Sequence, residues 1–385
     1  MQIEIKDRIL PRCWLEIDLA AITENVRNLR AFLKSETGII AVVKSNAYGH
    51  GIVEVAESII DYVDTFAVSS LDEALFLRES GVSKPILFLS NPIGEEDLDF
   101  IFQNNITPAI NGIEYLDVFE KKAKASETEL DVHLNIDTGM SRLGVLYDGR
   151  HAFLNSLNKI SALNIRGCFT HFAHAENIEY TRLQQGRFEK VSNMLKSSGH
   201  NFKQHAANSS AALRMPSVWY DYVRPGLILY GIYPDAAVKN RISIKQAMSF
   251  KTKLIQVKNV KKGTYIGYCC TYKAPSDMAI GVVPVGYNQG IPWSFSNKGC
   301  MLLRGRRVSI LGRVSMDQVV LDLREIENPG IGEEIVITGT QVQEELGIEE
   351  LAELSNTIPY EIVCGFGKVK TKKFLKSEEG GDCEK

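Results

Sequence analysis

A single lysine, Lys44, ends the apolar run of residues 38–43 and is followed at once by the small, polar and glycine-rich residues SNAYGHG. Lysine is almost never fully buried without a partner. A lysine removed from water has a lowered pKa, and its amine then becomes a nucleophile toward carbonyl compounds. The alternative is structural, since a lysine at a strand end can extend its ammonium group into water. On this segment alone both interpretations stay open.

Other polar groups also lie at the ends of short β-branched runs. They are Asp137–Arg142 after residues 131–137, Thr170 and His171 at the end of 165–172, His205, Asn208 and Ser209 at the end of 202–208, and Arg224 within 221–226. Each has a structural alternative by itself, such as a helix N-cap for Ser209 or a surface ion pair for Arg142. Taken together with Lys44, they indicate a site for an anionic small molecule, in which the lysine can form an imine.

The elements that must position these groups alternate between strand and helix from about residue 14 to 235. The runs expected to form strands are 38–43, 64–70, 84–90, 106–110, 131–137, 165–172, 202–208 and 221–226. Between them, apolar residues recur at three- and four-residue steps, as in Ile22, Val26 and Leu29. About eight such repeats predict a (β/α)8 TIM-type barrel, whose strands carry the site at their carboxyl ends. A doubly wound sheet is the alternative, but it would not usually need so many repeats.

From about residue 245 the helical periodicity gives way to short strands broken by glycine, which predicts a C-terminal mostly-β domain with one helix at 344–356. We therefore expect four segments. These are an N-terminal strand at 1–13 that packs with the C-terminal domain, the barrel at 14–240, the β domain at 245–375 and a disordered tail at 376–385.

Composition and charge exclude several classes of function. The 385 residues are 44% hydrophobic with a net charge of −3, which is typical of a globular protein without a nucleic-acid partner. No apolar run reaches the ~18 residues of a membrane span, and the N-terminal residues lack the apolar core of a signal peptide, so we expect a cytoplasmic protein. The seven cysteines are scattered and odd in number, so we predict neither a disulfide framework nor a metal site.

Eight motifs occur in the order found in one enzyme family: AVVKSNAYGHG, DTGMSRLG, FTHFAHA, HAANSSAAL, VRPGLILYG, CCTYKA, VPVGY and GRVSMDQ. Through them the chain resembles the alanine racemases, from about residue 12 to 370. The resemblance implies an enzyme dependent on pyridoxal 5′-phosphate (PLP). It also implies a barrel, a C-terminal β domain, and a homodimer whose active sites include residues of both chains.

The resemblance implies the following residues around the cofactor. Lys44 would bind PLP as an imine, and the phosphate would be held by Tyr48, by Asn208 and Ser209, and by the backbone amides of Gly226 and Leu227. Arg224 would face the pyridine nitrogen, with His205 behind it and His171 beside the ring.

The remaining residues implied by the resemblance serve the substrate. Arg142 would bind the cofactor phenolate or the substrate, Met316 and Asp317 would line the substrate carboxylate site, and Asn135 and Tyr287 would stand behind these groups. Tyr272, supplied by the other subunit, would be the second base, acting on the L-isomer while Lys44 serves the opposite face. An arginine at the ring nitrogen cannot give up its proton, which would suppress side reactions such as transamination.

Two departures from the family bear on the site. Asn135 stands where many relatives have a lysine, often carbamylated, that holds the arginine. We therefore expect Arg142 to depend on a bound chloride ion or on water. Gly367 and Lys368 stand near the C-terminus where relatives often carry a tyrosine or a basic residue, and less bulk near the substrate side chain would admit serine as well as alanine.

The function predicted from the sequence is the interconversion of L- and D-alanine, which would supply D-alanine for peptidoglycan. One alternative keeps the scaffold and changes the substrate or reaction, as in a serine or broad-specificity racemase or, more remotely, a decarboxylase. Another alternative is a non-catalytic PLP-binding protein. Relatives of that kind are single barrels without a counterpart of Tyr272 or Met316.

Overall fold

The computed structural model describes residues 10–239 and 241–376. They form two compact units, one of residues 22–47 and 51–244 and the other of residues 10–21, 48–50 and 245–376. Residues 1–9 of the expected N-terminal strand and nearly all of the expected disordered tail lie outside the described residues.

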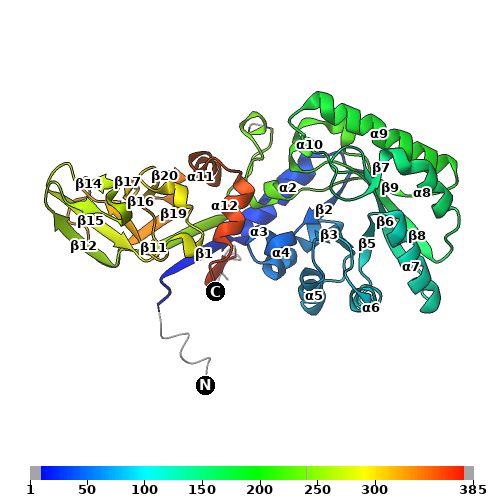
Figure 1. Ribbon diagram of the computed structural model, residues 1–385, viewed down its shortest axis with the longest axis horizontal. Helices are drawn as coiled ribbons and strands as arrows, with labels where there is room; N and C mark the ends of the chain where they lie inside the picture. Colours follow the sequence, from blue (N-terminus) through cyan, green and yellow to red (C-terminus); the bar gives the residue numbers. More distant parts are fainter. Residues whose placement is uncertain (1–9, 240, 377–385) are drawn as a thin grey trace, which may run out of the picture. The chain divides into compact units, whose positions relative to one another are not determined.

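The first unit is a closed barrel of eight parallel strands (Figure 1). Pairing runs around the barrel and closes where β10 pairs with β2. The strands are β2 (Gly38–Val42), β3 (Thr65–Val68), β4 (Ile86–Phe88), β5 (Thr107–Ile110), β6 (Leu130–Asp137), β8 (Leu163–Phe169), β9 (Lys203–His205) and β10 (Tyr222–Val223). The predicted (β/α)8 barrel is confirmed, and each strand overlaps one of the eight expected runs. Closure leaves these strands without an open sheet edge, which excludes the doubly wound alternative.

Burial on both faces explains why the barrel strands read as continuous apolar runs. Every residue of β2, β4 and β5 is buried. Helices cover the outside of the strands (Figure 1). These helices are α2 (Leu19–Phe32), α4 (Ile52–Ile59), α5 (Leu71–Glu79), α6 (Glu95–Gln103), α7 (Ile113–Ala125), α8 (Arg150–Leu157) and α9 (Ile178–Ser197). The shorter elements α3 (Lys44–Tyr48), β7 (Val145–Leu146) and α10 (Ser209–Arg214) follow strands β2, β6 and β9.

The second unit is built on a ten-stranded sheet in the order β12-β15-β18-β17-β16-β19-β11-β1-β21, with β20 paired to β19. Its strands are β1 (Cys13–Asp18), β11 (Met248–Lys253), β12 (Gln256–Val260), β15 (Met278–Val283), β16 (Cys300–Leu303), β17 (Arg306–Leu311), β18 (Val319–Asp322), β19 (Glu334–Gln341), β20 (Glu344–Leu346) and β21 (Lys372–Leu375). A separate hairpin pairs β13 (Tyr265–Ile266) with β14 (Tyr272–Lys273). The C-terminal domain is therefore mostly β, as expected.

Two details differ from the sequence prediction. The strand that joins the β domain lies at Cys13–Asp18 and pairs with both β11 and β21, whereas the sequence pattern ended it before Trp14. The β domain also has two helices rather than one, α11 (Ile348–Ser355) and α12 (Pro359–Phe366). The second helix begins with Pro359, because proline is favoured in the first turn, where its missing N–H has no partner in any case.

Among residues 10–239 and 241–376, no helix combines the length and the apolar character that a membrane span requires.

Gly167 of β8 offers a test of close packing inside the barrel. A Cβ at this position would collide with the imidazole of His133 on β6, whereas a Cβ on Gly186, inside α9, would meet nothing within 4 Å. We expect Gly167→Ala to lower the free energy of unfolding by about 1–3 kcal/mol through overpacking. The matched control Gly186→Ala should raise it by about 0.5–1 kcal/mol, because alanine favours helix interiors. Urea denaturation measures both, and changes of the same sign would contradict the packing account.

Candidate active site

Four of the expected site residues gather at the carboxyl end of the barrel. Lys44 follows β2, Arg142 lies in the loop after β6, His171 follows β8 and Arg224 follows β10. Burial, together with the charges of Arg224, Arg142 and Lys44, lowers the pKa of His171 to about 3. The His171 imidazole is therefore neutral at physiological pH and lies among three cations.

Lys44 is half-buried and begins α3, which is a single left-handed turn. The four residues that follow it, Ser45–Tyr48, have φ angles of 53–54°. The left-handed conformation costs roughly 1–2 kcal/mol for each residue other than glycine. Within the turn, the Ala47 N–H donates to the Val43 carbonyl at 2.7 Å. Strain of this size persists only where surrounding groups fix the conformation, and it is concentrated at functional sites.

Tyr48 ends the left-handed turn and is almost fully buried. Its ring centroid lies 5.8 Å from that of Tyr360 on α12, a residue that the sequence analysis did not select. The next residue, Gly49, has a φ of +83°, and a Cβ there would come within 2.5 Å of the Gly367 Cα. Glycine at position 367 therefore has a packing reason, because two backbones approach each other closely at this point.

Arg224 is only 4% exposed and is bound by neutral acceptors. Its guanidinium donates to the Thr170 carbonyl at 2.7 Å and to the Ala206 carbonyl at 3.1 Å. It also lies 2.8 Å from His205 Nδ1 and 3.5 Å from His171 Nδ1. Burial lowers the pKa of Arg224 to about 9, so the side chain keeps its charge at neutral pH.

The contacts of Arg224 fix the tautomers of the buried His205 and the half-buried His133. A guanidinium can only donate, so His205 Nδ1 accepts and the His205 proton lies on Nε2. That Nε2 is 2.8 Å from His133 Nδ1, which must then accept, leaving the His133 proton on its own Nε2. Burial and the charge of Arg224 lower the pKa of His133 to about 4 and that of His205 well below its ordinary value. Both histidines are therefore neutral.

The loop that carries Arg142 is shaped by the buried Asp137. One carboxylate oxygen of Asp137 accepts the N–H groups of Gly139 (2.9 Å), Met140 (2.9 Å) and Ser141 (3.1 Å). Helix α9 supports the same loop, because the Tyr180 hydroxyl donates to the Gly139 carbonyl at 2.8 Å. Arg142 itself is exposed. The loop thus presents a cation on a rigid support.

Asn135 is buried and joins a chain of amides across three neighbouring strand ends. Its Nδ2 donates to Asn111 Oδ1 at 2.7 Å, and Asn111 Nδ2 donates to Asn91 Oδ1 at 2.9 Å. Neutral amides therefore occupy the region in which the family resemblance would place a charged carbamate.

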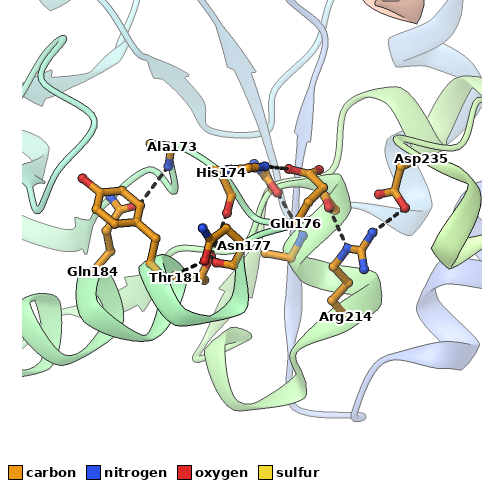
Figure 2. A network of polar contacts seen from close by, with 12 residues as sticks. Ala173, His174, Glu176, Asn177, Thr181, Gln184, Arg214 and Asp235 are labelled. Carbon is orange, nitrogen blue, oxygen red and sulfur yellow. Dashed lines mark hydrogen bonds and ion pairs between the residues drawn. The ribbon is translucent and has the colours of Figure 1, made fainter. Parts of the chain in front are cut away.

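The loop after β8, which carries His171, is held by the fully buried Gln184 of α9 (Figure 2). Gln184 Oε1 accepts the Ala173 N–H at 2.9 Å, and Gln184 Nε2 donates to the His171 carbonyl at 3.1 Å. Figure 2 also shows Thr181 of the same helix, whose hydroxyl donates to the His174 carbonyl at 3.0 Å. Helix α9 therefore fixes both loops that bring Arg142 and His171 to the mouth.

The expected phosphate ligands lie after β9 and β10. Ser209 Oγ accepts the Gly226 N–H at 3.0 Å, so the Gly226 amide is already bonded and the Ser209 O–H is the group left to donate. Asn208 is the N-cap of α10, where its Oδ1 accepts the Ala211 N–H at 3.0 Å. Leu227 is buried at the start of a 3-10 turn, Leu227–Tyr230.

In the β domain, Tyr272 is half-buried on the hairpin strand β14 and packs against the apolar cluster around Ile266 and Leu311. Asp322 raises the pKa of Arg324, and the phenol of Tyr272 adds to this effect, so a guanidinium lies near that tyrosine.

Met316, Asp317 and Tyr287 come together in the same domain. The Tyr287 N–H donates to the Ser315 carbonyl at 3.1 Å, and Asp317 Oδ1 accepts from Asn288 Nδ2 at 3.2 Å. Met316 is 54% exposed and Tyr287 47%. These loops leave an apolar and aromatic surface open.

The donor set at the barrel mouth fits PLP. A lysine amine can react with an aldehyde, the Ser209 hydroxyl can donate to a phosphate, and a buried Arg224 can only donate to a ring nitrogen. The half-buried Lys44 and the neutral His171 lie next to these groups, so the chemistry of the site matches the parts of the cofactor.

Several supporting residues escaped the sequence analysis. His133 and Gln184 lie outside the quoted motifs, and Asn111 directly follows the apolar run at residues 106–110. Signals existed for Asn111, which stands at the end of an expected strand, and for His133, which alternates with Asn135 and Asp137 on one face of the strand at residues 131–137.

The comparisons with known proteins cover nearly the whole chain. Residues 17–234 match the model of the alanine racemase N-terminal domain, and residues 247–374 match that of the C-terminal domain. The alanine racemase of Methanococcus maripaludis is 36% identical over 357 residues, which is 91% of this chain and 95% of that relative. This breadth of similarity includes the β domain that a single-barrel PLP-binding protein would lack.

Solved structures agree with these matches. Alanine racemase from the D-cycloserine producer Streptomyces lavendulae superposes with a TM-score of 0.89 at 30% identity, covering 96% of this chain and 98% of that one. Alanine racemase from Bartonella henselae, solved with covalently bound pyridoxal phosphate, gives a TM-score of 0.87 at 25% identity, covering 95% of this chain and 100% of that one. Alanine racemases are PLP-dependent isomerases, and these matches do not favour the serine racemase or decarboxylase alternatives. The chain belongs to the alanine racemase family.

Proposed function

We propose that this member of the family interconverts L- and D-alanine with two bases, Lys44 and Tyr272. The observation that carries the proposal is the position of the Lys44 amine, held in a strained turn beside Arg142, His171 and Arg224. Bound to Lys44, PLP would stabilise the negative charge left on the substrate Cα when its proton is removed. The Lys44 amine moves a proton on one face of the substrate, and the Tyr272 phenol moves one on the other.

The cations of the mouth bind the anionic parts of the ligands. Arg142 attracts the substrate or the cofactor phenolate, while Ser209 and Tyr48 donate to the phosphate, supported by Asn208, Gly226 and Leu227. Met316 and Asp317 border the place of the substrate carboxylate, with Tyr287 behind them. A chloride ion beside Arg142 and Asn135 supplies the negative charge that the amide lacks, and anomalous scattering at that point is the check.

The β domain supports a homodimer completed in trans. Its exposed aromatic side chains include Tyr268, which is 69% exposed, and Trp293, which is 53% exposed. Tyr268 lies four residues before Tyr272 in the sequence. The Trp293 ring centroid lies 4.9 Å from the guanidinium carbon of Arg313, which precedes Met316 by three residues. Large aromatic groups of this kind are typical of surfaces covered by a partner. A second copy of the chain would cover them and receive Tyr272.

Mixing two inactive variants tests both the bases and the dimer. We expect Lys44→Ala to lose the visible absorbance of the lysine-bound cofactor, and Tyr272→Phe to keep it while losing most racemisation. Dimers re-formed from equal amounts of both should recover about one quarter of wild-type activity, because half are mixed and each holds one complete site of two. No recovery would contradict completion in trans, and full activity of Tyr272→Phe alone would contradict the second base.

Arg224 faces the cofactor ring nitrogen in this proposal, and the two neutral histidines behind it keep its charge in place. His205 accepts from Arg224, and His133 accepts from His205. Burial lowers the pKa values of both histidines, and the positive charge of Arg224 lowers them further, because protonation of either would put a second positive charge beside it.

The lowered pKa of His133 predicts a loss of stability in acid. Its folded pKa of about 4 lies below the ordinary value of 6.5, so the unfolded chain takes up a proton first as the pH falls. The contribution is complete above about pH 6.5 and is lost toward about pH 4, at up to ~1.4 kcal/mol per pH unit. Urea denaturation between pH 5 and 7 should give a shallower slope for His133→Gln than for the wild type. His151→Gln, at an exposed position on α8, is the control, and equal slopes for the two variants would refute the assignment.

The reaction would supply D-alanine for peptidoglycan in the cytoplasm. Chiral chromatography after incubating the PLP-loaded protein with a panel of L-amino acids tests the substrate. We expect D-alanine to dominate and to approach equal amounts of both enantiomers. A comparable yield of D-serine would contradict alanine as the preferred substrate, and the absence of any D-product would contradict the function itself.

A further inference from the structure

The left-handed turn after Lys44 needs an external support, because its backbone conformation is unfavourable for Ser45, Asn46 and Ala47. Asn46 is exposed, so close packing of its side chain does not impose the conformation. Its backbone N–H and its side chain are both hydrogen-bonded. Asn46 Oδ1 accepts the N–H of Ile52 at 2.8 Å, which ties the turn to the start of α4, the next helix along the chain.

The backbone N–H of Asn46 donates to a residue of another element, Glu73 of α5, whose Oε1 lies at 3.2 Å. The second oxygen, Oε2, accepts the N–H groups of Ser69 at 3.0 Å and Ser70 at 3.3 Å. One carboxylate thus connects the turn that follows β2 with the residues that follow β3. These two strands are neighbours in the barrel.

Glu73 also belongs to the capping box of α5, in which Ser70 Oγ accepts the Glu73 N–H. A capping box requires only the bonds between Glu73 and Ser70. The bond to Asn46 goes beyond that requirement, because it reaches across 27 residues to a different loop. The cap keeps the Glu73 side chain in place, so the Oε1 oxygen is presented to the turn by a rigid helix start.

We propose that Glu73 is a positioning residue for Lys44: its carboxylate ties the strained lysine turn to the end of the neighbouring strand and so fixes the direction of the lysine amine. The proposal rests on the proposed role of Lys44. It assigns Glu73 no contact with substrate or cofactor. A glutamine at this position has one carbonyl oxygen, which can accept from the Asn46 N–H or from the N–H groups of Ser69 and Ser70. Its NH2 group would then face the remaining N–H donors and could not accept from them.

Hydrogen exchange of the PLP-loaded full-length protein tests the support directly. Loss of a hydrogen bond to a charged acceptor corresponds to about a tenfold change in an opening equilibrium. We therefore expect Glu73→Gln to increase exchange about tenfold in residues 44–52 and to leave the body of α5 unchanged. Asp72→Asn removes the same charge from the same helix turn and should leave residues 44–52 as in the wild type. Equal protection of residues 44–52 in Glu73→Gln and Asp72→Asn would overturn the proposal.

A kinetic readout separates positioning from general loosening. Lys44 acts on the D-isomer and Tyr272 on the L-isomer, so misdirection of the lysine should slow proton removal from D-alanine selectively. For Glu73→Gln we expect kcat/KM to fall about tenfold for both enantiomers, because an equilibrium constant of one keeps the two values equal. The selective readout is the primary isotope effect: it should rise with α-deuterated D-alanine and should not rise with α-deuterated L-alanine. Isotope effects that rise equally for both enantiomers would overturn the positioning role.

A glycine provides the rescue. Ser45 is exposed and has a φ of 54°, a conformation that glycine adopts without cost. In the Glu73→Gln background, Ser45→Gly should raise exchange protection of residues 44–52 at least severalfold. It should also return the isotope effect with α-deuterated D-alanine toward the wild-type value, because the turn then needs less support. A double variant no better than Glu73→Gln would overturn the proposal. If the wild type shows no absorbance of a lysine-bound cofactor, the role of Lys44 is contradicted. The hydrogen-exchange comparison then still tests whether Glu73 supports the turn.

Discussion

The concentration of positive charge at the barrel mouth is the constraint on which the rest of the site depends. Lys44, Arg142 and Arg224 all act on the neutral His171. Arg224 is buried and bound by neutral acceptors, so nothing within its own contacts cancels its charge. Such an arrangement is favourable only when a ligand brings anions into it. A phosphate and a carboxylate are the anions that a PLP enzyme acting on amino acids provides.

Positioning these cations requires supports outside the barrel strands. Helix α9 holds the loops that follow β6 and β8 through Tyr180 and Gln184. Helix α5 reaches the lysine turn through Glu73. Each support is a polar side chain on a rigid helix, and each bonds to backbone rather than to the reacting groups. The ends of the strands therefore set the positions of the functional residues, and hydrogen bonds from helix side chains set the conformations of the loops that carry them.

The β domain contributes a different kind of surface. Its sheet is a stable platform, and its loops leave Met316 and several aromatic side chains exposed. The structure of Gly286–Gly290 and Ser315–Gln318 is fixed by mutual hydrogen bonds, including that between Tyr287 and Ser315. In the proposed dimer these rigid loops with exposed apolar ends would enter the partner subunit with little loss of conformational entropy.

The sequence by itself determined the eight barrel strands, the mostly-β second domain and the family. These features can be predicted because they depend on residues close together in the chain. Parallel strands buried on both faces are continuous apolar runs, and the functional groups follow at their ends. Tertiary structure decided the rest. No glycine precedes Gly49 in the lysine turn, and of SNAY only Asn46 readily tolerates a left-handed backbone, so the sequence does not predict successive left-handed residues there. The same holds for the hydrogen bond between Asn46 and Glu73, for the tautomers of His133 and His205, and for the contact between Gly49 and Gly367. Each of these joins residues far apart in the chain, and only the folded backbone brings them within bonding distance.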